Sequence, residues 1–277
     1  MCLRPRTFWS CRWERWTPPK PPSATSWPFW KADFCTPESL LPMFARLQDL
    51  SESFKDFLYP PRCIVCHAAG SYLCATCQSQ ITRIAPPVCP ACGYPRRNAY
   101  APCRQCANHP LEHLDGIRSA ALFTEGPLRK AIHRLKYQGY FAIAKALAPL
   151  LIRCYTDHQL DTEVIVPVPL HSARYRERGF NQSMVLARAL AGALRQPVDG
   201  KTLIRHRATR SQMTLNAAER KANVARAFTC RTDRLAGKTV LLLDDVCTTG
   251  ATLDACAQAL KESGVRRVYG LTLARAL

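Results

Sequence analysis

The sequence predicts a parallel α/β domain that follows a small metal-binding module. Strand-like and helix-like segments alternate after Asp115, which is typical of a parallel sheet joined by right-handed crossovers. An uninterrupted apolar run at residues 240–243 indicates a strand buried on both faces. Four Cys-x-x-Cys pairs precede this region, and their spacing is typical of metal ligands.

The elements of the α/β domain follow from apolar periodicity. Residues 117–123 are predicted as a strand, and Pro127 lies near the start of a helix because proline suits the first helical position. A longer helix is expected over residues 141–155. Residues 164–169 form a strand that prolines interrupt, so its end must leave the sheet. Asn181 then caps a further amphipathic helix.

The strand at residues 240–243 leads into the most informative segment of the chain. Asp244 and Asp245 stand at its end, where carboxylates can accept hydrogen bonds from neighbouring ribose hydroxyls. The next seven residues are expected to form the loop before a helix, and its backbone N–H groups, threonine hydroxyls and glycine suit a phosphate. These predicted phosphate-binding residues are Val246, Cys247, Thr248, Thr249, Gly250, Ala251 and Thr252. The segment is therefore expected to hold a phosphate and a diol together.

Other phosphate-binding loops are excluded by their sequence patterns. The chain contains neither a Walker-type Gly-x-x-x-x-Gly-Lys-Ser/Thr sequence nor a Gly-x-Gly-x-x-Gly turn, so nucleoside triphosphates and dinucleotides are not the expected ligands. The segment instead resembles the phosphoribosyl pyrophosphate (PRPP) motif of type I phosphoribosyltransferases. In that motif an apolar strand and two acidic residues precede a Val-x-Thr-Thr-Gly-Ala/Ser-Thr loop. Cys247 lies inside this loop and is interpreted as a small space-filling residue rather than a nucleophile.

The chain is strongly basic, with 39 Lys and Arg residues against 20 Asp and Glu residues. Phosphorylated ligands or nucleic acid would be attracted to such a surface. Arg174, Arg176 and Arg178 alternate as on one face of an extended segment and could meet a pyrophosphate or a nucleic-acid backbone; a solvated loop is the alternative. Residues 205–212, which include Arg207, are expected to form a mobile basic loop before a helix opened by Asn216.

The cysteine pairs predict zinc. Two residues between thiolates let both sulfurs of a pair reach one ion, and two pairs complete a tetrahedral site. Neighbouring pairs could share an ion, or the first could join the third and the second the fourth; the neighbouring arrangement is favoured. No ligand is missing, so both zinc ions are expected to be structural and to stabilise a module with few large apolar residues. The eight predicted ligands are Cys63, Cys66, Cys74, Cys77, Cys89, Cys92, Cys103 and Cys106.

The N-terminal region differs from the rest of the chain. Residues 1–42 contain all five tryptophans among prolines and arginines and lack periodicity, whereas residues 43–58 predict an amphipathic helix. One hypothesis is that translation begins at Met43. No run is long and apolar enough for a signal peptide or a membrane span, so a cytoplasmic protein without membrane insertion is expected.

Beyond the PRPP motif, several strings together resemble the ComF family, bacterial proteins in which a double zinc ribbon precedes a phosphoribosyltransferase domain. The resemblance covers the chain from about residue 58 to its end and implies a double zinc ribbon at residues 59–112 and a phosphoribosyltransferase-like domain at residues 116–277. The strings are the Cys-x-x-Cys array, Leu135-Lys136-Tyr137, Val166-Pro167-Val168-Pro169, Arg178-Gly179-Phe180-Asn181-Gln182, and Thr209 with Gln212, Arg220 and Asn223.

The resemblance also implies residue roles. PRPP would bind with Mg²⁺ held mostly by substrate oxygens and water. Asp244 and Asp245 would hold the ribose hydroxyls, and the loop that follows would bind the 5′-phosphate. Val168, Pro169 and the nearby Arg174, Arg176 or Arg178 would face pyrophosphate, and the loop around Arg207 would close over the site.

Two functions remain open from the sequence. The first is a phosphoribosyltransferase with an unassigned acceptor, and the second is a single-stranded nucleic-acid-binding protein on the same fold without turnover. The ComF family is associated with uptake of external DNA in natural transformation. The resemblance therefore implies single-stranded DNA and proteins of the DNA-uptake machinery as partners.

Overall fold

The computed structural model describes residues 60–207 and 226–277, which belong to one compact unit, Glu52–Leu277. The expectations for residues 1–42 and 43–58 and for the helix opened by Asn216 lie outside the described residues.

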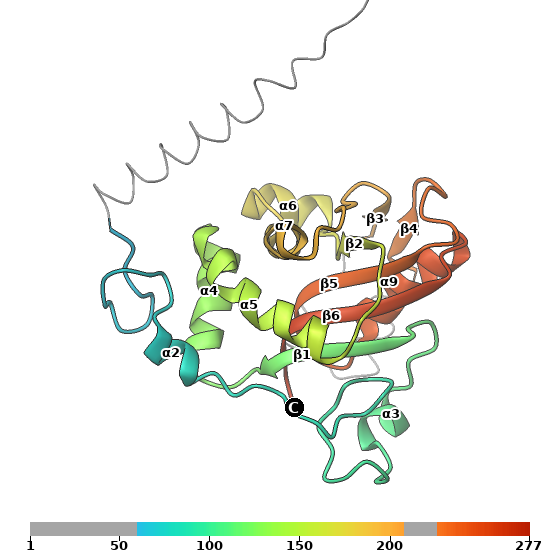
Figure 1. Cartoon of the computed structure of the whole chain (residues 1–277). Coiled ribbons are helices and arrows are strands. Elements are labelled where there is room, and N and C mark those ends of the chain that lie inside the picture. The colour runs from blue at the N-terminus through green and yellow to red at the C-terminus, as the bar shows by residue number, and fades with distance from the viewer. Residues whose placement is uncertain (1–59, 208–225) are drawn as a thin grey trace, which may run out of the picture. The chain divides into compact units, whose positions relative to one another are not determined.

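A four-stranded parallel sheet forms the centre of the α/β domain (Figure 1). The strand order is β1 (Gly116–Leu122), β6 (Arg267–Arg275), β5 (Thr239–Cys247) and β2 (Val164–Pro167). β5 pairs with β6 along its whole length and with the shorter β2 on its other side. Pro167 is the last residue of β2 and Pro169 follows it; because proline has no N–H to donate, both agree with the expected departure of the chain from the sheet here. The predicted parallel α/β fold is confirmed.

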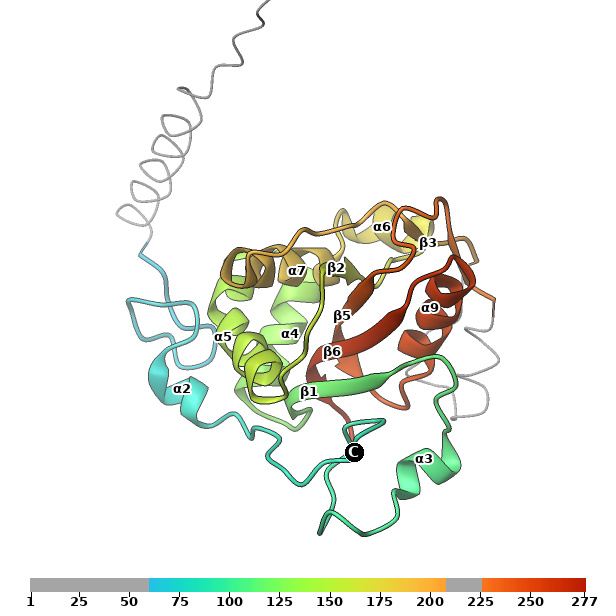
Figure 2. The same cartoon turned by 45° about the vertical axis from the view of Figure 1, so that its right-hand side comes forward.

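Helices cover both faces of the sheet (Figure 2). On one face lie α4 (Pro127–Gln138), α5 (Ala142–Asp157) and α7 (Gln182–Leu194), and on the other lies α9 (Ala251–Glu262). The expected cap of α7 is present, because Asn181 Oδ1 accepts a hydrogen bond of 3.0 Å from the Ser183 N–H. None of the described helices combines the length and apolar character that crossing a membrane requires.

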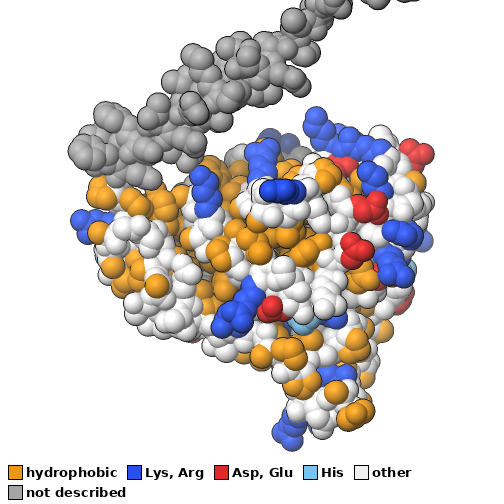
Figure 3. All heavy atoms as spheres, viewed as in Figure 1, with side chains coloured by type: hydrophobic (Ala, Val, Ile, Leu, Met, Phe, Trp, Pro, Cys, Tyr) orange, Lys and Arg blue, Asp and Glu red, His pale blue; other side chains and the backbone are white. Residues whose placement is uncertain are grey.

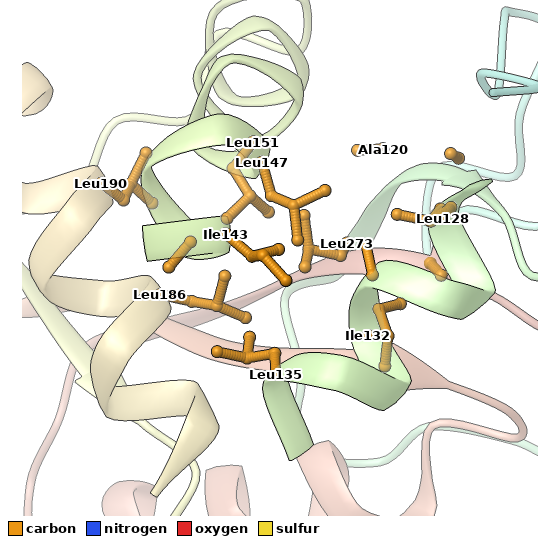
Figure 4. Close-up of a cluster of buried hydrophobic side chains, with 14 of the residues drawn as sticks. Ala120, Leu128, Ile132, Leu135, Ile143, Leu147, Leu151, Leu186, Leu190 and Leu273 are labelled. Carbon is orange, nitrogen blue, oxygen red and sulfur yellow. The ribbon is translucent and has the colours of Figure 1, made fainter. Parts of the chain in front are cut away.

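The α4, α5 and α7 face is held by a continuous apolar core (Figure 4). Burying one such leucine or isoleucine stabilises the fold by about 1.5–3 kcal/mol. This packing brings the last turn of α4 and the first turn of α7 to the carboxyl end of β5. The core residues labelled in Figure 4 are Ala120, Leu128, Ile132, Leu135, Ile143, Leu147, Leu151, Leu186, Leu190 and Leu273.

A short antiparallel pair completes the second face of the sheet. It consists of β3 (Leu203–Arg205) and β4 (Phe228–Cys230), and both strands pack against α9. Arg205 therefore ends a strand, which corrects the expectation that it begins a basic loop. Pairing of Arg205 with Phe228 accounts for the difference, because it places the residue in a ladder. The rest of that loop from residue 208 lies outside the described residues.

The cysteine-rich module packs against the α/β domain through its own backbone. Two short helices, α2 (Ala75–Ser79) and α3 (Arg104–Asn108), each begin just after a ligand cysteine. Beside β1, the Ile84 N–H donates to Ala120 O at 3.1 Å, and the Leu122 N–H donates to Thr82 O at 2.8 Å. The module is thus continuous with the edge of the sheet.

Candidate functional site

Two adjacent carboxylates occupy the carboxyl-terminal part of β5 and have different partners. Asp245 is only 3% exposed and forms an ion pair with the Nζ of Lys136 in the last turn of α4. Its Oδ1 also accepts a hydrogen bond of 3.4 Å from Gln182 Nε2. Asp244 Oδ1 instead accepts from the Ser183 hydroxyl and from the Asp245 N–H, both at 2.9 Å. The first turn of α7 therefore supplies one donor to each carboxylate.

These surroundings separate the pKa values of the two carboxyl groups. Burial raises the pKa of Asp244, and the charge of Asp245 raises it further, to about 7. Burial acts in the same direction on Asp245, but the Lys136 ammonium outweighs it and lowers the pKa of Asp245. Asp245 also raises the pKa of Lys136 against the effect of burial. Asp245 is therefore ionised, whereas Asp244 changes its charge near neutral pH.

The loop after the carboxylates is shorter than the sequence predicts. Val246 and Cys247 continue β5, because β6 extends to Arg275 and offers them ladder partners. Ala251 and Thr252 already belong to the first turn of α9. The connection itself is residues 248–250, so the expectation of a seven-residue loop is wrong. The order of strand, carboxylates, threonines, glycine and helix is as predicted.

The connection is closely packed around Gly250. This residue has φ 91°, a left-handed conformation that favours glycine, and a Cβ there would lie 3.0 Å from Ile117 and from Leu111. Thr249 is 8% exposed, and its Oγ1 accepts a hydrogen bond of 3.3 Å from the Ala251 N–H. Backbone N–H groups at the start of α9 and threonine hydroxyls are groups that bind a phosphate.

Cys247 is a buried thiol rather than an exposed nucleophile. It is 3% exposed, and burial raises its pKa, which disfavours the reactive thiolate. Its Sγ accepts a hydrogen bond of 3.1 Å from the guanidinium of Arg275, which is itself fully buried. The space-filling interpretation agrees with this geometry.

The three alternating arginines lie on a helix, so the expectation of an extended segment is wrong. α6 spans Ser172–Arg178; His171 Nδ1 accepts from the Ala173 N–H at its start, and Gly179 ends it with φ 79°. At helical spacing Arg174 and Arg178 share a side, whereas Arg176 projects from another. The arginines therefore do not form one row toward a single ligand.

The residues predicted to face pyrophosphate have separate surroundings. Arg178 contacts Gln182 Oε1 and lies over the Tyr137 ring at 5.3 Å, on the Asp245 side of the site. Val168 is buried, and its carbonyl accepts a hydrogen bond of 3.0 Å from Asn181 Nδ2. Pro169 and Arg176 line a neighbouring groove, and Arg207 is exposed beyond β3.

This groove is wide and open, with a volume of about 1580 Å³. Among the described residues that line it, none is Asp or Glu. Phe141 and Phe180 meet edge to face at 4.8 Å, and Phe141 and Tyr175 are about half exposed. Figure 3 shows hydrophobic side chains exposed on one face of the molecule, with Lys and Arg side chains around them. The aromatic and basic residues of this aromatic-basic groove are Tyr72, Phe141, Tyr175, Phe180, Lys145, Arg176, Arg188, Arg205 and Arg231.

The cysteines form two clusters, and neighbouring pairs share each one. Within each cluster, the four Sγ atoms lie within 4.8 Å of one another. Distances of 3.5–3.6 Å between sulfurs of different pairs fit a tetrahedral zinc site, in which Zn–S bonds of about 2.3 Å place sulfurs about 3.8 Å apart. Four thiolates per cluster leave no open ligand position, so zinc would have a structural role in both. The first cluster is Cys63, Cys66, Cys74 and Cys77, and the second is Cys89, Cys92, Cys103 and Cys106.

The second cluster is linked to the elements that surround the residue 248–250 connection. Gly93 lies so close to β1 that a Cβ would be 2.3 Å from Ile117 O. The chain leaving this cluster is held at α9, because Asp254 Oδ1 accepts hydrogen bonds of 2.9–3.2 Å from the N–H groups of residues 112–114. The buried Arg275 lies over the Tyr94 ring of the module at 5.7 Å while it contacts Cys247. The second cysteine cluster and the chain that leaves it thus pack against the start of α9 and support it.

Sequence reasoning assigned no role at the site to Lys136, Gln182 or Ser183. A signal for Lys136 was present, because it follows Ile132 by four residues and so continues the apolar stripe of α4 with a charged side chain. The other two residues follow the correctly predicted cap Asn181. Their role depends on the placement of α7 beside β5, which the sequence alone does not give.

Zinc content tests the two clusters. We expect two Zn²⁺ ions per chain by elemental analysis, and one after Cys63→Ser/Cys66→Ser or after Cys89→Ser/Cys92→Ser, because each substitution removes two of four ligands. Cys154→Ser, at a buried thiol outside both clusters, is the matched control and should keep both ions. Loss of both ions from either double variant would contradict independent sites.

The raised pKa of Asp244 predicts a dependence of stability on pH. The folded state favours the protonated group, so its stabilisation is present at low pH and is lost as the pH rises through about 7. Asp244→Asn should therefore raise the free energy of unfolding by about 1–3 kcal/mol near pH 8, with a smaller difference near pH 5. Urea denaturation at both pH values measures this, with the exposed Asp161→Asn as control. A variant less stable than wild type at the higher pH would contradict it.

Comparisons with known proteins match both parts of the chain. A double zinc ribbon domain matches residues 54–107, and a phosphoribosyl transferase domain matches residues 181–276. The solved glutamine phosphoribosylpyrophosphate amidotransferase of B. subtilis is 20% identical, with a TM-score of 0.33 over 48% of this chain and 27% of that one.

Two relatives are similar over nearly their whole length. DNA utilization protein YhgH of Escherichia coli is 35% identical over 79% of this chain and 98% of its own, and competence protein F of Haemophilus influenzae is 34% identical over 78% and 97%. With both domains matched in this order and this identity over almost all of each relative, the chain belongs to the ComF family, in which a double zinc ribbon precedes a phosphoribosyltransferase domain.

Proposed function

We propose that this protein binds PRPP with Mg²⁺ at the carboxyl end of β5 and acts in the handling of DNA taken up from outside the cell. One observation carries the proposal of PRPP binding: Asp244 and Asp245 lie near the end of β5, which is followed directly by the residue 248–250 connection and the start of α9. A carboxylate for the ribose hydroxyls and N–H donors for the 5′-phosphate lie within one short segment. Mg²⁺ would be held mainly by pyrophosphate oxygens and water, as this hard cation prefers.

The basic character of the region supports an anionic ligand. Lys136 and Arg178 lie within the network around the two carboxylates, and Val168 and Pro169 lead from β2 toward α6. A leaving pyrophosphate carries charge that such fixed groups can stabilise. Transfer of the phosphoribosyl group from bound PRPP to an acceptor would use the same geometry.

The link to DNA comes from the relatives, whose names refer to competence and to DNA utilization. The proposal therefore includes a cytoplasmic location and contact with proteins of the DNA-uptake machinery. A second candidate function, binding of single-stranded DNA, is favoured by the aromatic-basic groove. Exposed rings can stack on bases, and a lining whose described charged residues are all basic suits a phosphate backbone.

Thermal unfolding tests PRPP binding. Mg-PRPP at about 100 times its Kd should stabilise the wild type by about 2.7 kcal/mol and raise its Tm by several degrees. Asp244→Asn should abolish this shift, because the neutral amide is a weaker acceptor for ribose hydroxyls. The exposed Asp161→Asn is the control and should shift like wild type. Equal shifts in Asp244→Asn and wild type would remove the assigned site.

Titration with a fluorescent oligo-dT at several salt concentrations tests the groove. Phe141→Ala should weaken binding by about 1–3 kcal/mol without changing the salt dependence, because it removes stacking. Arg188→Gln should lower the slope of log affinity against log salt by about 0.7, because it removes one phosphate contact. Arg153→Gln is the control, because Arg153 lies in α5 but does not line the groove. It should leave the affinity and its salt dependence unchanged. Unchanged binding in both groove variants would exclude this surface.

A further inference from the structure

Lys136 occupies an unusual place for a lysine. It lies in the last turn of α4, and its side chain is only 23% exposed. Lysines are seldom buried without a partner, since the ammonium loses its hydration. The partner here is Asp245, whose side chain is 5% exposed. Removing either member alone would leave the other charge, in a poorly solvated place, without its direct partner.

The pair belongs to a closed network of side chains. Gln182 donates to Asp245 and accepts from Arg178, and the Arg178 guanidinium lies over the ring of Tyr137. Tyr137 is adjacent to Lys136 in the chain, so the contacts form a closed ring. The network joins α4, α6, α7 and β5 around Asp245. These contacts hold the Asp245 side chain in one position.

Asp244 has a different environment. Its two hydrogen bonds from described residues, from Ser183 and from the Asp245 N–H, both fall on Oδ1. Its side chain is more exposed than that of Asp245, the next residue in the chain, which forms the ion pair with Lys136. Of the two carboxylates, Asp244 is thus the one with capacity to receive further donors.

We propose that Lys136 is a positioning residue that gives the two neighbouring carboxylates different tasks: it holds Asp245 as a fixed charge, and it leaves Asp244 to accept hydrogen bonds from the ribose hydroxyls. This inference rests on the proposed PRPP site. It differs from the expectation that both carboxylates hold the ribose, because Asp245 is already occupied by Lys136 and Gln182.

Substitution of Asp245 by asparagine should act on the ligand through Lys136. Lys136 also experiences the charge of Asp244. If Asp245 loses its charge, the ammonium has one remaining carboxylate partner nearby and should pair with Asp244. Asp244 would then be withdrawn from the ligand. Asp245→Asn should therefore weaken binding through Lys136, and removal of the lysine should reverse the loss.

A double-substitution cycle measured by calorimetric titration with Mg-PRPP tests this. We expect Asp245→Asn to weaken binding by about tenfold or more, and Lys136→Met/Asp245→Asn to bind within about threefold of wild type. If Asp245 contacts the ribose directly, the double variant will bind as weakly as Asp245→Asn, and the proposal is overturned. If wild type does not bind Mg-PRPP, it is the proposed function that fails.

The pH profile of binding provides a readout that a purely structural role would not move. Affinity should rise as Asp244 ionises, and in Lys136→Met the midpoint should move upward by about half a pH unit or more, because a stabilising positive charge is gone. Lys130→Met, at an exposed lysine of the same helix, is the matched control and should keep the wild-type midpoint. An unchanged midpoint in Lys136→Met would count against the proposal.

Thermal unfolding without ligand keeps the test decisive if Lys136→Met folds poorly. The Tm should fall in each single variant and recover at least partly in the double variant, because a neutral pair replaces a single buried charge. Additive losses in the double variant would show that the two side chains are not coupled and would overturn the proposal.

Discussion

Parallel pairing of β5 on both of its sides is the constraint on which the rest of the site depends. A strand buried between β6 and β2 must be apolar along the sheet interior. Charged side chains can therefore occur only near its carboxyl end. Asp244 and Asp245 occupy that position. Because the same strand continues into α9 through three residues, the carboxylates and the helix start are held at a fixed separation. Ligands of open parallel sheets bind at this edge for the same reason.

Placing two adjacent carboxyl groups in a poorly solvated site lowers the stability of the fold, and the surrounding helices reduce this loss. Burial raises the pKa of Asp244 and repulsion from the charge of Asp245 raises it further, whereas Lys136 keeps Asp245 ionised. The apolar core of α4, α5 and α7 supplies the stability that allows this arrangement. Such a conflict between stability and local charge is expected at a functional site.

The zinc module is an integral part of the fold. Its first cluster contributes Cys63 and Cys77 to the apolar core, and its second cluster supports the start of α9 through Asp254 and Arg275. A small segment with few large apolar residues gains its rigidity from metal coordination and can then support a neighbouring helix. Metal binding and the geometry of the residue 248–250 connection are therefore linked.

By itself the sequence determined the parallel sheet, the zinc-ligand spacing, the cap Asn181 and the strand that ends in two carboxylates, because all of these follow from local periodicity, spacing or turn chemistry. Only the tertiary structure decided the end of β5, the helical form of residues 172–178 and the partners of the carboxylates. The first depends on how far β6 extends, and the second on capping that outweighs an alternating charge pattern. The pairing of Lys136 with Asp245 joins residues more than one hundred positions apart, and no local pattern encodes which charges meet when α4 packs beside β5.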